Sequence, residues 1–390
     1  MNSPNWPLPA SRTAAVNPFR VMSVMERAGQ LSLQGRHIVH LEVGEPDFAT
    51  VGPIIEAGKQ ALDAGRTAYT PAPGLPALRR RIAQWYAQRH QVEVDPARIF
   101  VTPGASGALH LLAQLLINPG DGVLMSDPGY PCNRNYVALA GGRTQLVPLS
   151  ADTGWQLTPE RLEALRDDGT RGVWLASPSN PTGAAMSREA LVALSDWAQE
   201  HRLYLLVDEI YHGLDFTGGL PSALEVNPGA IVVNSFSKYF GMTGWRLGWF
   251  IVPEHLIEVC NTLAQNLFIA APTVSQYAAL RAMDDDLVVE HERRREIFRQ
   301  RRDFLTPALR EIGFDIPQDA DGAFYLYAGI GRFSDDSESF CHGLLEEHGV
   351  ALTPGTDFGL HRARDHVRLA FTTDQESLGL AVERMRRALA

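Results

Sequence analysis

The stretch NSFSKYFGMTGWRLGW, residues 234–249, follows the short apolar run AIVV at residues 230–233. It holds one lysine, Lys238, close in sequence to Ser235, Ser237 and Arg246. Such a set predicts a cationic, donor-rich pocket, which suits an anionic ligand and disfavours protonation of the lysine amine. A lysine condenses with an aldehyde only when it is deprotonated, and a neighbouring positive charge is one way to lower its pKa. The stretch therefore indicates the chemistry of an imine-forming lysine.

The composition predicts a soluble enzyme with a large core. The chain has 390 residues, 45% of them hydrophobic, and this length favours two domains. The formal net charge of -10 argues against nucleic acid or an anionic membrane as partners, because both need a basic surface. The cysteines are few and far apart, and no signal peptide or apolar stretch of about 18 residues is present. We therefore expect a cytoplasmic protein.

Short apolar runs alternate with helical patterns along the chain, which predicts an α/β sheet. The expected strands are residues 98–102, 122–127, 171–177, 203–209, 230–235 and 245–252, and the expected helices include 75–91, 106–116 and 187–201. From residue 291 the pattern changes to long charged helices with a strand pair near 322–330 and 366–372. This change indicates a second, smaller α+β domain. The proline-rich first twenty residues suggest either an extended arm on another surface or a disordered tail.

Polar side chains follow several of these strands, where ligands bind in open α/β sheets. Ser106 opens a glycine-rich helix start, whose backbone N–H groups can bind an anion, although a plain helix cap is the alternative. Asp208 ends an apolar run and is costly to bury without a cationic partner, which a protonated pyridine nitrogen would supply. Asn180 and Tyr211 complete the group. No P-loop, G-x-G-x-x-G, H-E-x-x-H or C-x-x-C pattern occurs, so we expect no metal site.

At this point the residues resemble a known family. The run SFSKYFGMTGWRLG at 235–248, together with LEVGEPDF, AYTPAPGLPALR, VTPGASGAL, DPGYP, SNPTG, VDEIY, GAFYLY and VRLAF, resembles the class I and II aminotransferases of fold type I, which use pyridoxal phosphate. The resemblance covers nearly the whole chain. It implies a large domain with a mixed, mainly parallel seven-stranded sheet between helices, plus a smaller α+β domain built from both termini. The implied boundaries are 1–45 for the N-terminal arm and part of the small domain, 46–285 for the large cofactor-binding domain and 286–390 for the small C-terminal domain.

The resemblance also implies a role for each matched residue toward the cofactor pyridoxal 5'-phosphate. Lys238 would form the imine and move the proton of the substrate Cα, Asp208 would pair with the pyridine N–H, and Tyr211 would bond the ring oxygen. These three are the expected catalytic residues. The remaining expected cofactor contacts are Ala105, Ser106, Tyr130, Asn180, Ser235, Ser237, Arg246 and, from the facing subunit of a homodimer, Tyr69.

Arg368, with Gly44 and Asn180, matches the family's contacts to the substrate α-carboxylate, which a planar guanidinium holds through two parallel bonds. The implied reaction is ping-pong transamination from an L-amino acid to a 2-oxo acid. A lyase or synthase of the same fold, an effector-sensing regulator and a protein with a dead site are the alternatives. The substrate side chain stays open: Arg20 is a candidate partner for a carboxylate, whereas Tyr130 favours neutral or aromatic substrates, because aspartate-specific members often have Trp there.

Overall fold

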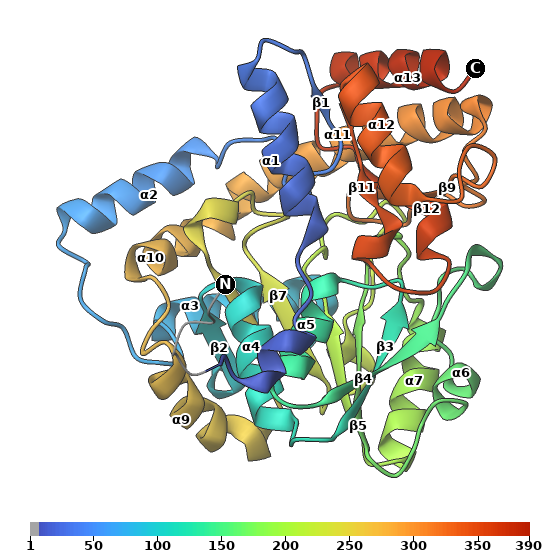
Figure 1. Ribbon diagram of the computed structural model, residues 1–390. Helices are drawn as coiled ribbons and strands as arrows, with labels where there is room; N and C mark the ends of the chain where they lie inside the picture. Colours follow the sequence, from blue (N-terminus) through green and yellow to red (C-terminus); the bar gives the residue numbers. More distant parts are fainter. Residues whose placement is uncertain (1–7) are drawn as a thin grey trace.

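A seven-stranded sheet is the central layer of the larger part of the molecule (Figure 1). The computed structural model describes residues 8–390. The strand order is β2 (Ile99–Thr102), β8 (Gly248–Ile251), β7 (Ile231–Ser235), β6 (Tyr204–Asp208), β5 (Thr170–Ala176), β3 (Gly122–Asp127) and β4 (Arg143–Pro148). Only β8 runs antiparallel to its neighbours; the other pairs are parallel. The mixed, mainly parallel seven-stranded sheet predicted from the sequence is therefore confirmed.

The strands carry apolar residues on both faces because helices cover the sheet on both sides. In β7, Ile231 and Val233 pack in one apolar cluster and Val232 in the other, as the two-residue period of a strand requires. The first cluster includes α4 (Gly104–Leu116) and α9 (Ile257–Leu267), and the second includes α3 (Pro76–His90) and α7 (Arg188–Glu200). The sheet is thus buried between two layers of helices.

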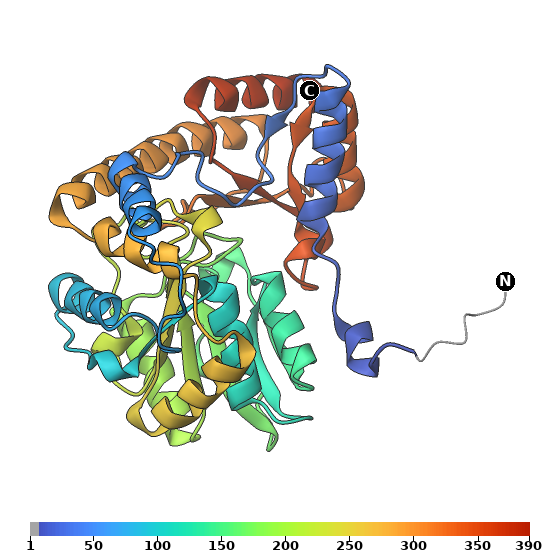
Figure 2. The ribbon, with the colours of Figure 1, turned by 90° about the vertical axis from the view of Figure 1, so that its left-hand side faces the viewer.

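The smaller part combines segments from both ends of the chain (Figure 2). Strand β1 (Val39–His40) pairs with β10 (Val350–Ala351), and β11 (Thr353–Pro354), β12 (His366–Ala370) and β9 (Tyr325–Gly329) form an antiparallel sheet. The helices here are α1 (Arg20–Leu33), α11 (Asp285–Ile312), α12 (Ser337–His348) and α13 (Gln375–Ala388). This arrangement agrees with the expected α+β unit built from both termini. The boundaries at residues 45 and 285 stay a prediction.

The remaining helices are α2 (Gly52–Asp63), α5 (Pro131–Leu139), α6 (Pro159–Glu163), α8 (Ala223–Val226) and α10 (Thr273–Ala282). Before α1, the backbone of Asn17 exchanges two hydrogen bonds of 3.1 Å with the Asn135 side chain on α5. The first seven residues of the expected arm lie outside the described residues. Within residues 8–390, no helix has both the length and the apolar character needed to cross a bilayer.

Candidate active site

A cavity of about 690 Å³ opens at the carboxyl ends of three neighbouring strands. Ala176, Asp208 and Ser235, the last residues of β5, β6 and β7, all line it. It brings together twelve of the residues singled out in the sequence: Gly44, Ala105, Ser106, Tyr130, Asn180, Asp208, Tyr211, Ser235, Ser237, Lys238, Arg246 and Arg368. Tyr69 and the candidate Arg20 do not line it. Residues up to 324 positions apart in sequence thus meet in one place.

One end of the cavity is rich in hydrogen-bond donors. Helix α4 starts there, and no side chain caps its first N–H groups. A Cβ at Gly104 would lie 2.6 Å from Arg246 Nη2, and one at Gly248 would lie 2.7 Å from the Ala105 nitrogen, so only glycine permits this close packing. Ser106 and Ser237 add hydroxyl groups. Free N–H groups at a helix start, hydroxyls and a guanidinium are the donor set that fits a phosphate monoester.

Arg246 reaches this end through an unusual backbone conformation. The sequence predicts a strand from residue 245, but Thr243–Trp245 forms a 3-10 turn and Arg246 is left-handed, with φ of 52°. Its Nη1 donates to the Thr243 carbonyl at 3.0 Å. The strand therefore starts only at Gly248. A left-handed backbone conformation costs free energy for any residue other than glycine, and such strained residues are concentrated at functional sites.

Lys238 lines the cavity, and its Nζ donates to the Gly44 carbonyl at 2.7 Å. Burial lowers the pKa of Lys238 to about 8, and the charges of Arg368 and Arg246 add to the effect, against Glu45 and Asp208. A neutral amine is therefore accessible near physiological pH. This is the condition that imine chemistry requires of a lysine.

Asp208 faces the same cavity from the end of β6. Burial raises its pKa to about 7, although a hydrogen bond of 3.1 Å from the Ile210 N–H and the charge of Lys238 oppose the shift. The carboxylate thus lacks a strong cationic partner of its own. A ring N–H⁺ placed against it would supply that partner, so the carboxylate end and the donor-rich end both fit pyridoxal phosphate.

Tyr325, on β9, is a cavity residue to which the sequence assigned no role. Its hydroxyl lies 2.9 Å from the Tyr211 hydroxyl, and the Arg368 guanidinium lies 4.4 Å from its ring centroid. A side chain at Gly44 would collide with the Tyr325 hydroxyl. Tyr325 therefore contacts three expected site residues at once. The motif GAFYLY contained it, but only the fold shows which tyrosine of the two reaches the cavity.

Arg368 is held rigidly, with 2% of its surface exposed. Its Nη1 donates to Asn180 Oδ1 at 3.0 Å, and its Nη2 donates to the Glu42 carbonyl and to Thr353 Oγ1. Within residues 8–390, its buried Nε has no acceptor. A buried cation of this kind needs an anion, and the paired Asn180 suits a carboxylate bound at both groups.

An apolar wall closes the cavity on the side of α1. We name Phe19, Val21, Met22 and Met25, which line the cavity there, the α1 wall. The buried carboxylate of Asp357 holds its position by accepting the N–H groups of Arg20 at 2.9 Å and Val21 at 3.3 Å. The Arg20 guanidinium instead pairs with Glu338 on α12 and does not line the cavity. The candidate partner for a substrate carboxylate therefore points elsewhere.

Tyr69 lies outside the cavity, with 80% of its surface exposed. The backbone beside it is anchored, because Thr273 donates to the Ala68 carbonyl at 2.8 Å and Gln276 donates to Thr70 at 2.9 Å. An aromatic side chain on an anchored loop, exposed to this degree, is typical of a residue that contacts another chain.

The sequence and the fold match those of known proteins. A family model described as Aminotransferase class I and II matches residues 36–385. A valine–pyruvate aminotransferase of Mycobacterium tuberculosis is 37% identical over 374 residues, 95% of this chain and 96% of that protein. A (5-formylfuran-3-yl)methyl phosphate transaminase of Methanocaldococcus jannaschii is 35% identical over 374 residues, with the same coverage of 95% and 96%. The structure of an aspartate aminotransferase from Thermus thermophilus with maleate matches with a TM-score of 0.94 at 35% identity, covering 98% of this chain and 100% of that one.

The sheet topology and the solved relatives define a transferase of fold type I. The chain belongs to the class I and II aminotransferase family, and it is an aminotransferase. This family uses pyridoxal phosphate and acts on amino acids and 2-oxo acids. The family and the activity predicted from the sequence are confirmed.

Proposed function

We propose that the cavity binds pyridoxal 5'-phosphate and transfers the amino group of a neutral, apolar L-amino acid to a 2-oxo acid, at a site completed by a second subunit. One observation carries this proposal: Lys238, Asp208 and the uncapped start of α4 face the same cavity. These three features correspond to three parts of that cofactor. The amine with a lowered pKa matches its aldehyde, the carboxylate without a cation matches its ring nitrogen, and the cluster of hydrogen-bond donors matches its phosphate.

The residues divide among the parts of the cofactor. Asp208 would hold the ring N–H, Asn180 and Tyr211 the ring oxygen, and Tyr130 the ring face. The phosphate would lie at the start of α4, against Ala105, Ser106, Ser235, Ser237 and Arg246. When bound, the protonated ring withdraws electrons from the substrate Cα and makes its proton acidic.

Lys238 is the group that we assign to the proton of the substrate Cα. With a pKa of about 8, its amine is neutral often enough to accept a proton and basic enough to return it. Arg368 and Asn180 hold the substrate carboxylate in both halves of a ping-pong reaction, so the Cα proton is presented to the same amine each time. The Nζ position is defined by the bond to the Gly44 carbonyl.

The α1 wall supports the substrate class. The three cationic side chains of the lining, Lys238, Arg246 and Arg368, all have assigned partners, and Glu45 adds a negative charge. The Phe19 ring meets the Tyr130 ring edge-on at 6.3 Å, so the side-chain end of the cavity is apolar. An acidic substrate side chain would lose its hydration there without gaining a counter-charge from the described residues.

Tyr69 and its surroundings support a homodimer with shared active sites. The segment beside Tyr69 packs against residues 271–276, which begin two positions after Ile269. Ile269 is half exposed and left-handed, with φ of 63°, a costly conformation for a β-branched residue. Exposed apolar side chains and a strained exposed residue fit a surface that a second copy covers.

A half-reaction screen tests the proposal. The cofactor-loaded enzyme is mixed with each amino acid in turn, and the loss of the visible cofactor absorbance is followed. We expect leucine, valine, methionine or phenylalanine to react at least about tenfold faster than aspartate or glutamate. Lys238→Ala should abolish the reaction, whereas the chain's other lysine, exposed Lys59, should tolerate the same change. Preference for aspartate would refute the apolar substrate class, and turnover by Lys238→Ala would refute the role of the lysine.

A further inference from the structure

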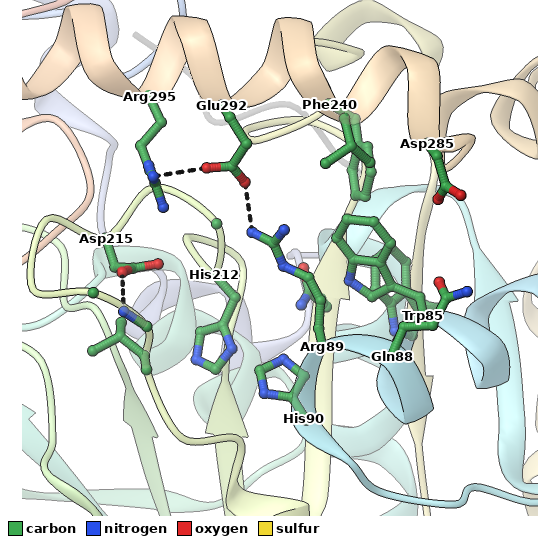
Figure 3. Close-up of a pocket in the computed structure, with 17 residues that line it drawn as sticks. Trp85, Gln88, Arg89, His90, His212, Asp215, Phe240, Asp285, Glu292 and Arg295 are labelled. Atoms are coloured by element: carbon green, nitrogen blue, oxygen red, sulfur yellow. Dashed lines mark hydrogen bonds and ion pairs between the residues drawn. The ribbon is translucent and has the colours of Figure 1, made fainter.

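A second cavity, of about 610 Å³, shares no lining residue with the candidate active site. Figure 3 shows the residues that line it. Its walls come from α3, from α11 and from the loop that follows β6. We propose that this cavity binds a free α-amino acid as a zwitterion, with the carboxylate against Arg89 and Arg295 and the ammonium group against Asp215. The binding itself does not depend on the proposed function; only its expected effect, inhibition of transamination, does.

The two cavities lie on opposite sides of two chain segments that they share. His212 follows Tyr211, and Asn234 precedes Ser235. Tyr211 and Ser235 line the active-site cavity, whereas His212 and Asn234 line the second cavity. A ligand in the second cavity would therefore touch the backs of the segments that build the active site.

One side of the second cavity carries excess positive charge. Arg89 Nη2 donates to Glu292 Oε1 at 2.8 Å, and Arg295 Nη2 lies 2.8 Å from Glu292 Oε2 (Figure 3). Two guanidiniums therefore share one carboxylate. The Arg89 guanidinium also lies 5.0 Å from the Trp85 ring centroid, which orients it. A second carboxylate, brought by a ligand, would balance this pair and use the N–H groups that Glu292 leaves free.

A buried carboxylate, that of Asp215, lines the same cavity from another element. Asp215 Oδ1 accepts the Gly219 N–H at 2.8 Å, and the carboxylate lines the cavity from the loop after β6 (Figure 3). Its charge is one of those that raise the pKa of Arg89. Burial and the charge of Arg89 lower the pKa of His90 to about 4, and Asp215 opposes that shift. A third carboxylate, Asp285, lies in the first turn of α11. Guanidiniums facing a carboxylate are the arrangement that recognises a carboxylate and an ammonium group on one small molecule.

Two buried polar groups beside this cavity lack partners. The His212 side chain is 7% exposed, and within residues 8–390 neither ring nitrogen makes a hydrogen bond, although Nδ1 lies 3.5 Å from Glu209 Oε2. The Trp249 Nε1 is likewise without an acceptor among those residues. Buried polar groups are seldom left unpaired, so their presence here indicates a polar occupant.

The cavity has a direct link to the catalytic lysine. Tyr239, the residue after Lys238, donates its hydroxyl to Glu292 Oε1 at 2.6 Å. The Arg89 guanidinium also lies 5.2 Å from the Tyr239 ring centroid. A ligand carboxylate that draws Arg89 or Arg295 toward itself changes the bond that holds Tyr239. Binding should therefore inhibit transamination without competing with the amino donor.

The test uses the cofactor-loaded Arg368→Ala enzyme, whose active site has lost its carboxylate contact, and titrates it calorimetrically with each common L-amino acid. We expect at least one to bind at one site per chain with a Kd below about 10 mM. Adding Arg295→Ala should weaken this binding at least about tenfold. Adding Arg293→Ala, an exposed arginine of the same helix that pairs with Glu290 away from the cavity, should leave it unchanged.

Asp215→Asn tests the ammonium contact. It should weaken amino acid binding at least about tenfold and leave binding of the matching 2-oxo acid unchanged. If Arg368→Ala fails to fold, the wild-type enzyme is used, and the amino acid should inhibit noncompetitively unless Arg295 is replaced. The absence of saturable binding below about 10 mM, equal effects of Arg295→Ala and Arg293→Ala, or equal affinity for the oxo acid would each overturn the proposal. The half-reaction screen with the wild-type enzyme is independent of these results, so failure here leaves the proposed function standing.

Discussion

The lowered pKa of Lys238 predicts a distinctive pattern of chemical labelling. The chain has only two lysines, Lys59 and Lys238. They fall in different proteolytic peptides, so mass spectrometry can assign every lysine label to one of them. The cofactor-free protein is treated with an amine-reactive reagent for a short pulse at a series of pH values. The fraction of each lysine that reacts is then measured after digestion. Only the neutral amine reacts, so the pH dependence of the rate reports the pKa of each group.

The expected size of the effect follows from the site. Burial, Arg368 and Arg246 lower the pKa of Lys238 from 10.5 to about 8. At pH 7 the neutral fraction of such an amine is about 300 times that of an ordinary lysine. Burial also slows access of the reagent, which scales the rate at every pH by the same factor. The midpoint of the profile is therefore the quantity to compare, and we expect it near pH 8 for Lys238.

A variant separates charge from burial. Arg246→Gln removes one of the two cations that lower the pKa of Lys238, and it should move the midpoint upward while the Lys59 profile stays where it was. A midpoint for Lys238 at the value of an ordinary lysine, near pH 10.4, would refute the reasoning. So would a profile of Lys238 that coincides with that of Lys59 throughout.

Other predictions concern single side chains of the same cavity. Burial raises the pKa of Asp208 from 3.8 to about 7, so ionisation of Asp208 destabilises the cofactor-free protein as the pH rises from 4 to 7. The Asp208→Asn variant should therefore be as stable as the wild type near pH 4. At pH 8 its free energy of unfolding in urea should be higher by up to about 4 kcal/mol. Tyr325→Phe removes the hydrogen bond to Tyr211 and should shift the pH at which the absorbance of the bound cofactor changes. The control is Tyr327→Phe, on the same strand, whose hydroxyl has no partner among residues 8–390; it should not shift that pH. Met22→Arg adds a cation to the α1 wall and should raise the half-reaction rate of aspartate relative to leucine at least about tenfold, and an unchanged ratio would contradict the assignment of this wall.

The sheet and most of the cavity lining were predictable because their signals are local. Apolar runs ending in Asp208 or Ser235 mark strand ends, and strand ends of one sheet meet at one edge. The start of α4 was also predictable, because the glycines that mark it are close together in sequence. The roles of these residues toward the cofactor stay proposals, but their convergence follows from the order of the strands.

The features that the sequence did not predict depend on contacts between distant segments. The Arg246 guanidinium lies against Gly104, which belongs to another element. Tyr325 meets Tyr211 across 114 positions of sequence. The Arg20 side chain turns toward Glu338, 318 positions away, and no local pattern distinguishes that partner from a substrate carboxylate. Each of these contacts joins segments that are distant in sequence, and hydrophobic periodicity does not encode which segments meet.

The two cavities give one explanation for why the segment around Lys238 is so densely packed. Lys238 must keep its amine beside the Gly44 carbonyl, yet its neighbour Tyr239 is bonded to Glu292 on α11. Phe240, next along, packs its ring 5.3 Å from that of Trp85 on α3. The position of the Lys238 amine therefore depends on α3 and α11, which do not line the candidate active site. Substitutions on the faces of α3 and α11 that line the second cavity should change the reactivity of Lys238 more than their distance from the substrate suggests, and the labelling profile would detect that change directly.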